Sequence, residues 1–157
     1  TRKVSRSNTV QNDLIGEWNL LHSENFDKCL EKLGVETTHR EIAHLQSTTL
    51  TISQQDNQWT IFAEGAYAIH KTIFEIGKPT QSVRTVDGRI VTSTWTIDRN
   101  GKLLKREKNE ATGVEMECEM YVKNEILIQK MKCSGVKSRR TYAKSHVCTL
   151  RRLSSVF

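Results

Sequence analysis

The clearest pattern in the chain is the alternation of apolar and charged residues between Val114 and Val122. Apolar side chains occupy every second position, and three glutamates lie between them. Successive side chains of a strand point to opposite faces, so this pattern predicts a strand with one apolar and one wet face. Short apolar and β-branched segments separated by turn residues recur along most of the chain. The predicted strands are 16–21, 48–53, 59–63, 68–76, 81–86, 90–98, 102–108, 114–122, 126–133 and 137–143.

A helical pattern follows the first of these strands. Four apolar residues recur there at spacings of three and four, which places them on one face of a short helix. Ser23 is the predicted N-cap, because its hydroxyl can accept a hydrogen bond from a first-turn N–H. Gly34 suits the left-handed conformation that ends many helices. The apolar stripe consists of Phe26, Cys29, Leu30 and Leu33.

A second short helix is predicted before the strands resume. Thr38 and Glu41 have the spacing of a capping box, in which two first-turn donors are satisfied reciprocally. We expect this helix to extend to about Gln46. From Ser47 onward no segment has helical periodicity.

Ten strands in simple up-and-down order predict a mainly β protein, a closed antiparallel barrel. The barrel domain is expected at 14–144, with a flexible basic arm at 1–13 and a C-terminal extension at 145–157. Hydrophobic residues make up only 36% of the chain. A low apolar content favours a thin-walled barrel around a ligand cavity over a thick layered fold.

The net charge of +6 admits two interpretations. A basic protein is attracted to nucleic acid or to an anionic membrane. Alternatively, the charge belongs to a solvated surface and to basic ends, and we favour this second interpretation. Much of the excess lies near the two ends, at Arg2, Lys3, Arg6, Lys144, Arg151 and Arg152.

The four cysteines show no CxxC pair and no zinc-type spacing with histidine. The pattern favours reduced thiols in a cytoplasmic protein and argues against a disulfide framework. The five histidines are scattered, so no metal site is expected, and no cysteine or serine has an evident base partner for catalysis. No transmembrane or signal-type segment is visible, although the chain begins at Thr1, which leaves secretion after signal removal open.

The N-terminal region resembles the signature of the intracellular lipid-binding proteins, the family of fatty-acid-binding and cellular retinoid-binding proteins. The resemblance covers about residues 14–144. Cys29 departs from it, because the family usually has a larger apolar residue there. The matching residues are Gly16, Trp18, Leu20, Asn25, Phe26, Asp27, Leu30 and Leu33.

The resemblance implies that the two helices form a lid on the barrel and that Arg140 and Tyr142 bind a ligand carboxylate. Residues two apart on a strand face the same way, so both side chains would enter the cavity together. A buried guanidinium keeps its charge and therefore requires an anion. The alternative is that Arg140 and Tyr142 are two amphipathic residues on an exposed strand edge and bind no ligand.

Further ligand contacts are implied with less support from the residues themselves. The position of a second family arginine falls on Cys118 or Met120, both apolar, so a single-arginine site or a less charged ligand is expected. Tyr67 and Arg40 match portal and lid residues or are simply surface residues, and Trp95 could be core or ligand contact. The full set of expected contacts is Arg140, Tyr142, Cys118, Met120, Gln129, Trp95, Tyr67 and Arg40.

The expected function is therefore non-enzymatic binding and transport of long-chain fatty acids or similar lipids by a monomer. No cofactor and no nucleic acid partner are expected. Transient contact with anionic membranes is a further expectation. The alternative is a basic barrel module that binds nucleic acid or an anionic membrane surface. The string Arg151-Arg152-Leu153-Ser154 has the form of a kinase site, a pattern common by chance.

Overall fold

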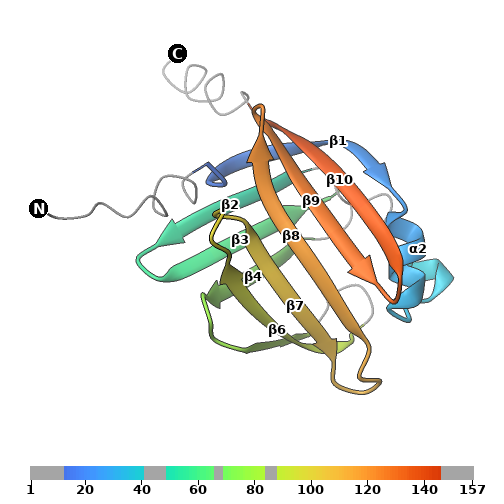
Figure 1. The fold of residues 1–157 in the computed structure, drawn as a ribbon. Helices are drawn as coiled ribbons and strands as arrows, with labels where there is room; N and C mark the ends of the chain where they lie inside the picture. Colours follow the sequence, from blue (N-terminus) through green and yellow to red (C-terminus); the bar gives the residue numbers. More distant parts are fainter. Residues whose placement is uncertain (1–12, 41–48, 66–68, 84–87, 146–157) are drawn as a thin grey trace, which may run out of the picture.

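Ten antiparallel strands form one sheet that curls into a nearly closed barrel (Figure 1). The structure is a computed structural model that describes residues 13–40, 49–65, 69–83 and 88–145. The strands are β1 (Gly16–Glu24), β2 (Thr49–Gln55), β3 (Gln58–Glu64), β4 (Ile69–Glu75), β5 (Thr80–Val83), β6 (Ile90–Ile97), β7 (Leu103–Asn109), β8 (Glu115–Lys123), β9 (Ile126–Cys133) and β10 (Val136–Lys144). The helix α2 spans Phe26–Lys32.

The hydrogen-bonded order of the sheet is β4-β3-β2-β1-β10-β9-β8-β7-β6-β5. Consecutive strands are therefore neighbours, and β1 meets β10 to bring the two ends of the barrel domain together. Within the described residues, β4 and β5 are the two edges of the sheet. The predicted mainly β, up-and-down barrel of ten strands is confirmed, and the barrel closes everywhere except between these edges.

The N-cap of α2 was predicted incorrectly. The strand β1 continues through Ser23 to Glu24, with a register irregularity between Leu20 and His22. The N-cap is Asn25, in the left-handed conformation at φ 57° and without a side-chain capping bond. Pairing with β10 extends the strand past the residue that local capping preference would select. At the other end, Gly34 has the expected positive φ, 85°.

The second helix begins two residues earlier than the predicted capping box requires, at residue 37 and not at residue 39. Residues 37–40 are helical, and the amide of Arg40 donates to the carbonyl of Glu36 at 2.9 Å. Thr38 thus lies inside the helix and is not its N-cap. The remainder of the predicted helix, including Glu41, lies outside the described residues, as do the expected N-terminal arm and nearly all of the C-terminal extension.

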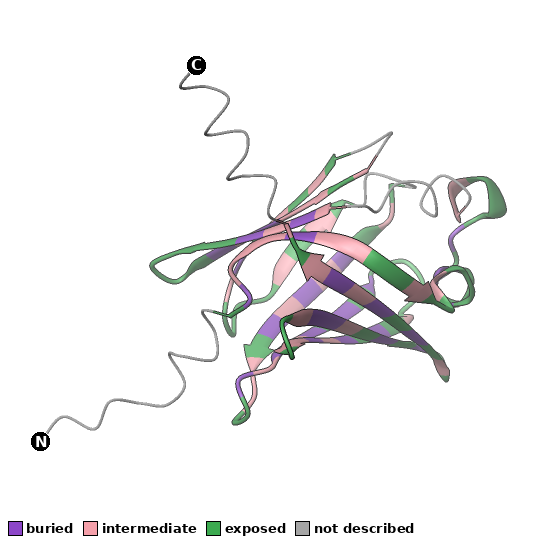
Figure 2. Cartoon of the chain, turned by 90° about the horizontal axis from the view of Figure 1, so that it is seen from above, coloured by how far each residue is buried: buried purple, intermediate pink, exposed green. Residues whose placement is uncertain are grey.

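The interior of the barrel shows the period-two burial that the sequence pattern predicts (Figure 2). Trp18 is 1% exposed, and its indole N–H donates to the carbonyl of Leu14, so this residue belongs to the core as expected. On the opposite wall, Phe74 stacks between Trp59 and Trp95. No helix among the described residues has the length and apolar character needed to cross a membrane.

A disulfide bond joins Cys29 of α2 to Cys133 at the end of β9. The prediction of four reduced cysteines was therefore wrong. The two residues are 104 positions apart, and only the packing of α2 against β9 and β10 brings them together. Sequence spacing carries no information about such a pair. The bond attaches α2 to the sheet, and Figure 1 shows this helix beside the ends of β9 and β10.

Reduction of this disulfide is expected to destabilise the protein by about 2–4 kcal/mol, because the bond restricts a long loop in the unfolded chain. Urea unfolding with and without dithiothreitol measures the difference. The variant Cys29→Ala/Cys133→Ala is the control, and its unfolding curve should not respond to the reductant. Equal unfolding free energies for the oxidised and reduced wild type would contradict the prediction.

Candidate ligand-binding site

The inner face of β7 to β10 consists of rows of residues that pair side by side across the four strands. One row contains Leu103, Met120, Gln129 and Arg140. The adjacent row contains Lys105, Cys118, Met131 and Ser138. All of these residues are buried except Gln129, which is partly buried. The wall therefore presents two charged groups, Arg140 and Lys105, and two neutral polar ones, Gln129 and Ser138, among apolar side chains.

Arg140 lies on this inner face, as predicted, and is 5% exposed. Its Nε donates to Ser23 Oγ at 3.2 Å, and its guanidinium carbon lies 4.0 Å from the ring centroid of Phe26 on α2. Burial lowers the pKa of Arg140, and the neighbouring Tyr142 partly opposes this effect. The first residue of the helix thus stacks on the cation that the sequence singled out.

Tyr142 faces the same way as Arg140 and is 1% exposed. Its hydroxyl donates to Gln129 Oε1 at 3.2 Å, which connects it to the row of Arg140. Burial raises the pKa of Tyr142, with Arg140 acting in the opposite direction. The phenol is therefore neutral at physiological pH, and its one proton is donated to Gln129, a bond that it would exchange to donate to a ligand.

Cys118 occupies the adjacent row and is buried without a disulfide. Burial raises its pKa to about 11, although Lys105 and a hydrogen bond with Gln129 act in the opposite direction. A thiol with this pKa is protonated at neutral pH and is a poor nucleophile. Cys118 and Gln129 together link the surroundings of Tyr142 to those of Lys105.

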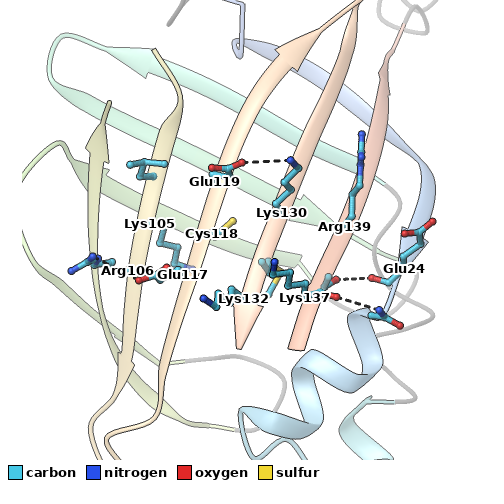
Figure 3. Close-up of a pocket in the computed structure, with 14 residues that line it drawn as sticks. Glu24, Lys105, Arg106, Glu117, Cys118, Glu119, Lys130, Lys132, Lys137 and Arg139 are labelled. Atoms are coloured by element: carbon cyan, nitrogen blue, oxygen red, sulfur yellow. Dashed lines mark hydrogen bonds and ion pairs between the residues drawn. The ribbon is translucent and has the colours of Figure 1, made fainter. Parts of the chain in front are cut away.

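A cavity of about 690 Å³ lies against β7, β8, β9 and β10 (Figure 3). This volume falls in the range expected for a small-molecule site, roughly 300–1,000 Å³. Its buried lining is the row of Lys105. Most of its other lining residues are exposed side chains on the outer face of the same strands, so the cavity is open to the surface of this wall. Arg140 is in the next row and Tyr142, which pairs with Leu127, is in the row beyond it. Neither residue is among those that line the cavity.

The cavity is bounded at one end by the junction of β1 and α2, at Glu24 and Asn25. Ser138 Oγ donates to the carbonyl of Glu24 at 2.9 Å, and the Asn25 side chain donates to the carbonyl of Lys137 at 3.2 Å (Figure 3). These bonds fix the start of the helix against β10. They position Phe26 over Arg140.

The sequence analysis missed a charged pair on the inner face of β7. Lys105 Nζ lies 2.8 Å from Glu107 Oε1, and their side chains are 10% and 4% exposed. Ser93 Oγ lies within 3.4 Å of the same carboxylate oxygen. The segment Lys102–Lys108 is polar on both faces, so alternation could not show which side chains point inward. Only its pairing with β8, whose phase is clear, determines this.

The remaining residues predicted to contact the ligand lie in different parts of the structure. Met120 is buried in the row of Arg140, and Trp95 is buried beside Lys105 on the neighbouring strand. Arg40 forms an ion pair with Asp27 of α2 at 3.1 Å and donates to the carbonyl of Val35 at 2.8 Å. It connects the two helical segments. Tyr67 lies outside the described residues.

Comparison with known proteins was made by sequence and by structure. No family model matches the chain. The chain is 30% identical to the human intestinal fatty acid-binding protein over 127 residues, 81% of this chain and 95% of that protein. It is 32% identical to human fatty acid-binding protein 9 over 130 residues, 83% of this chain and 96% of that protein.

Two similar solved structures agree with this result. Apo lipid binding protein 8 of Caenorhabditis elegans has a TM-score of 0.80 at 26% identity, covering 92% of this chain and 100% of that chain. Fatty-acid-binding protein 1 of Echinococcus granulosus has a TM-score of 0.77 at 26% identity, covering 85% and 98%. The matches span the whole barrel, and so the chain belongs to the fatty-acid-binding proteins of the intracellular lipid-binding family.

Proposed function

We propose that this protein is a non-enzymatic carrier of long-chain fatty acids and that Arg140, assisted by Tyr142, binds the ligand carboxylate. Membership of the family supports lipid binding and transport. The observation that carries the finer proposal is the buried Arg140 guanidinium on the inner face, two residues from an equally buried Tyr142. A permanent cation in such a place favours an anionic ligand group.

The arrangement around Arg140 supports a single-arginine anchor. Met120 is in the row of Arg140, and Cys118 is in the adjacent row. These are the two positions on which the resemblance places a second arginine. A methionine supplies no charge, so the carboxylate would receive charge-assisted bonds from Arg140 and a neutral bond from Tyr142. The stacking of Phe26 on Arg140 would be loosened or shifted when a carboxylate enters.

The alternative of a basic surface module receives no support from the outer face of β7 to β9. Arg106 and Lys130 approach Glu117 and Glu119 there, at 3.7 and 3.9 Å. Cations and carboxylates alternate on this face, so it offers no continuous positive surface for a polyanion.

The compartment in which the carrier works is a separate matter. The cysteine pattern favoured the cytoplasm, whereas the disulfide between Cys29 and Cys133 favours an oxidising compartment. We infer that the bond persists only where thiols are not kept reduced. Counting alkylated thiols in the protein purified from its native source decides between the two.

Replacing Arg140 by alanine is expected to weaken the binding of a long-chain fatty acid by roughly ten- to a hundredfold. Affinity for the matching fatty alcohol should change little, because the alcohol brings no charge to the guanidinium. Displacement titrations of both ligands on both proteins measure the effect, with circular dichroism to verify the fold. Arg139→Ala is the matched control, since Arg139 is the exposed neighbour on the same strand. A mutant that keeps the full preference for the acid would place the anchor elsewhere.

We also propose that exposed cations of the lid guide docking to anionic membranes during ligand transfer. Lys32, in the last turn of α2, is exposed, whereas Arg40 is engaged with Asp27. Transfer of a fluorescent fatty acid should be faster to anionic than to neutral vesicles at low salt, and Lys32→Ala should reduce this difference. Lys132→Ala, on the exposed face of β9, should not. Equal rates to both kinds of vesicle with the wild type would reject the proposal.

A further inference from the structure

A second polar cluster lies inside the barrel, away from the row of Arg140. Two cross-strand pairs of β6 and β7 form it, Ser93 opposite Glu107 and Trp95 opposite Lys105. All four residues are buried. Lys105 and Glu107 form the ion pair described above, Ser93 contacts the carboxylate, and Lys105 Nζ lies 5.2 Å from the centroid of the Trp95 ring.

One member of this cluster has a buried donor that no described residue of the protein accepts. Trp95 is 4% exposed, and its indole Nε1 has no hydrogen-bond acceptor among the described residues. Buried polar groups are nearly always hydrogen-bonded, so this indole N–H calls for a partner that the described residues do not supply, a role that a ligand group can fill. Phe74 stacks on the ring at 4.1 Å between centroids, which holds the indole in place.

The cluster is next to space that a ligand can enter. Lys105 lines the cavity together with Cys118, Met131 and Ser138, its partners in the same row. Lys105 is three strands from Arg140 in the sheet order, which corresponds to about 14 Å along the wall. A ligand with its carboxylate at Arg140 therefore has to extend its chain past apolar side chains to reach Lys105.

We propose that this cluster, Trp95, Lys105, Glu107 and Ser93, is a second ligand subsite that recognises a hydroxyl group on the acyl chain. The protein would accordingly select hydroxylated fatty acids over unmodified ones. The proposal rests on the carboxylate site of the proposed function, because that site determines which end of the ligand enters this region.

The chemistry of the cluster favours a neutral hydroxyl over other groups. A hydroxyl can accept a hydrogen bond from the indole N–H or the ammonium and donate one to the carboxylate. A plain acyl chain at the same place would bury charged and polar groups against methylene and leave the indole donor unpaired. A second carboxylate would approach Glu107 and meet a like charge, which disfavours it.

The test compares the affinities of palmitate, ω-hydroxypalmitate, a mid-chain hydroxypalmitate and hexadecanedioate, measured by displacement titration. In the wild type at least one hydroxy acid should bind about tenfold tighter than palmitate, and the diacid should bind less tightly than that hydroxy acid. In Lys105→Met/Glu107→Leu the order of hydroxy acid and palmitate should reverse. Removing both charges together avoids an unpaired buried ion.

Two further variants keep the result interpretable. Trp95→Phe retains the ring and removes the N–H, so it should reduce the hydroxyl preference severalfold even if the double variant fails to fold. Arg140→Ala should weaken palmitate and the hydroxy acid alike and leave their ratio unchanged, which separates a failure of the carboxylate site from a failure of this subsite. Two results would overturn the inference and leave Lys105 and Glu107 as a structural ion pair. One is that the wild type binds palmitate as tightly as every hydroxy acid. The other is that its preference for a hydroxy acid survives both in Trp95→Phe and in the double variant.

Discussion

The burial of permanent charge inside a wall one strand thick is the constraint on which this structure depends. Arg140 and Lys105 both point into the barrel, where desolvation opposes charge. Each is surrounded by groups that compensate for the loss of water. Arg140 has Ser23, Tyr142 and the face of Phe26, and Lys105 has Glu107 and the face of Trp95.

These compensations are of different kinds, and the difference bears on ligand selection. The Lys105–Glu107 pair is internally neutral, whereas Arg140 contacts a hydroxyl, a phenol and an aromatic ring. The proposed carboxylate at Arg140 and the proposed hydroxyl at Lys105 correspond to this difference. Cys118 and Gln129 lie between the two and provide a weakly polar connection without further charge.

The disulfide adds a mechanical condition to this arrangement. It attaches α2 to β9, and the first residue of α2 is the phenylalanine that stacks on Arg140. While the bond is intact, α2 cannot leave the wall to uncover Arg140, the proposed carboxylate anchor. Ligand exchange in the oxidised protein therefore has to proceed with this helix in place, and the ion pair between Arg40 and Asp27 connects the following helical segment to it.

The sequence by itself determined the class of fold. Period-two alternation, best seen from Val114 to Val122, and regular turn signals define ten strands, because side-chain direction in a strand depends on local geometry alone. The inward direction of Arg140 and Tyr142 followed from the same rule combined with the family resemblance. Their role as the carboxylate anchor remains a prediction.

Only the tertiary structure decided features that depend on residues far apart in the chain. Strand pairing carried β1 beyond the expected cap at Ser23, and helix packing joined Cys29 to Cys133. Pairing of β7 with β8 turned Lys105 and Glu107 inward, on a strand whose own alternation is uninformative because both of its faces are polar. Local sequence preference cannot specify these contacts, since each is made with a partner that folding alone brings near.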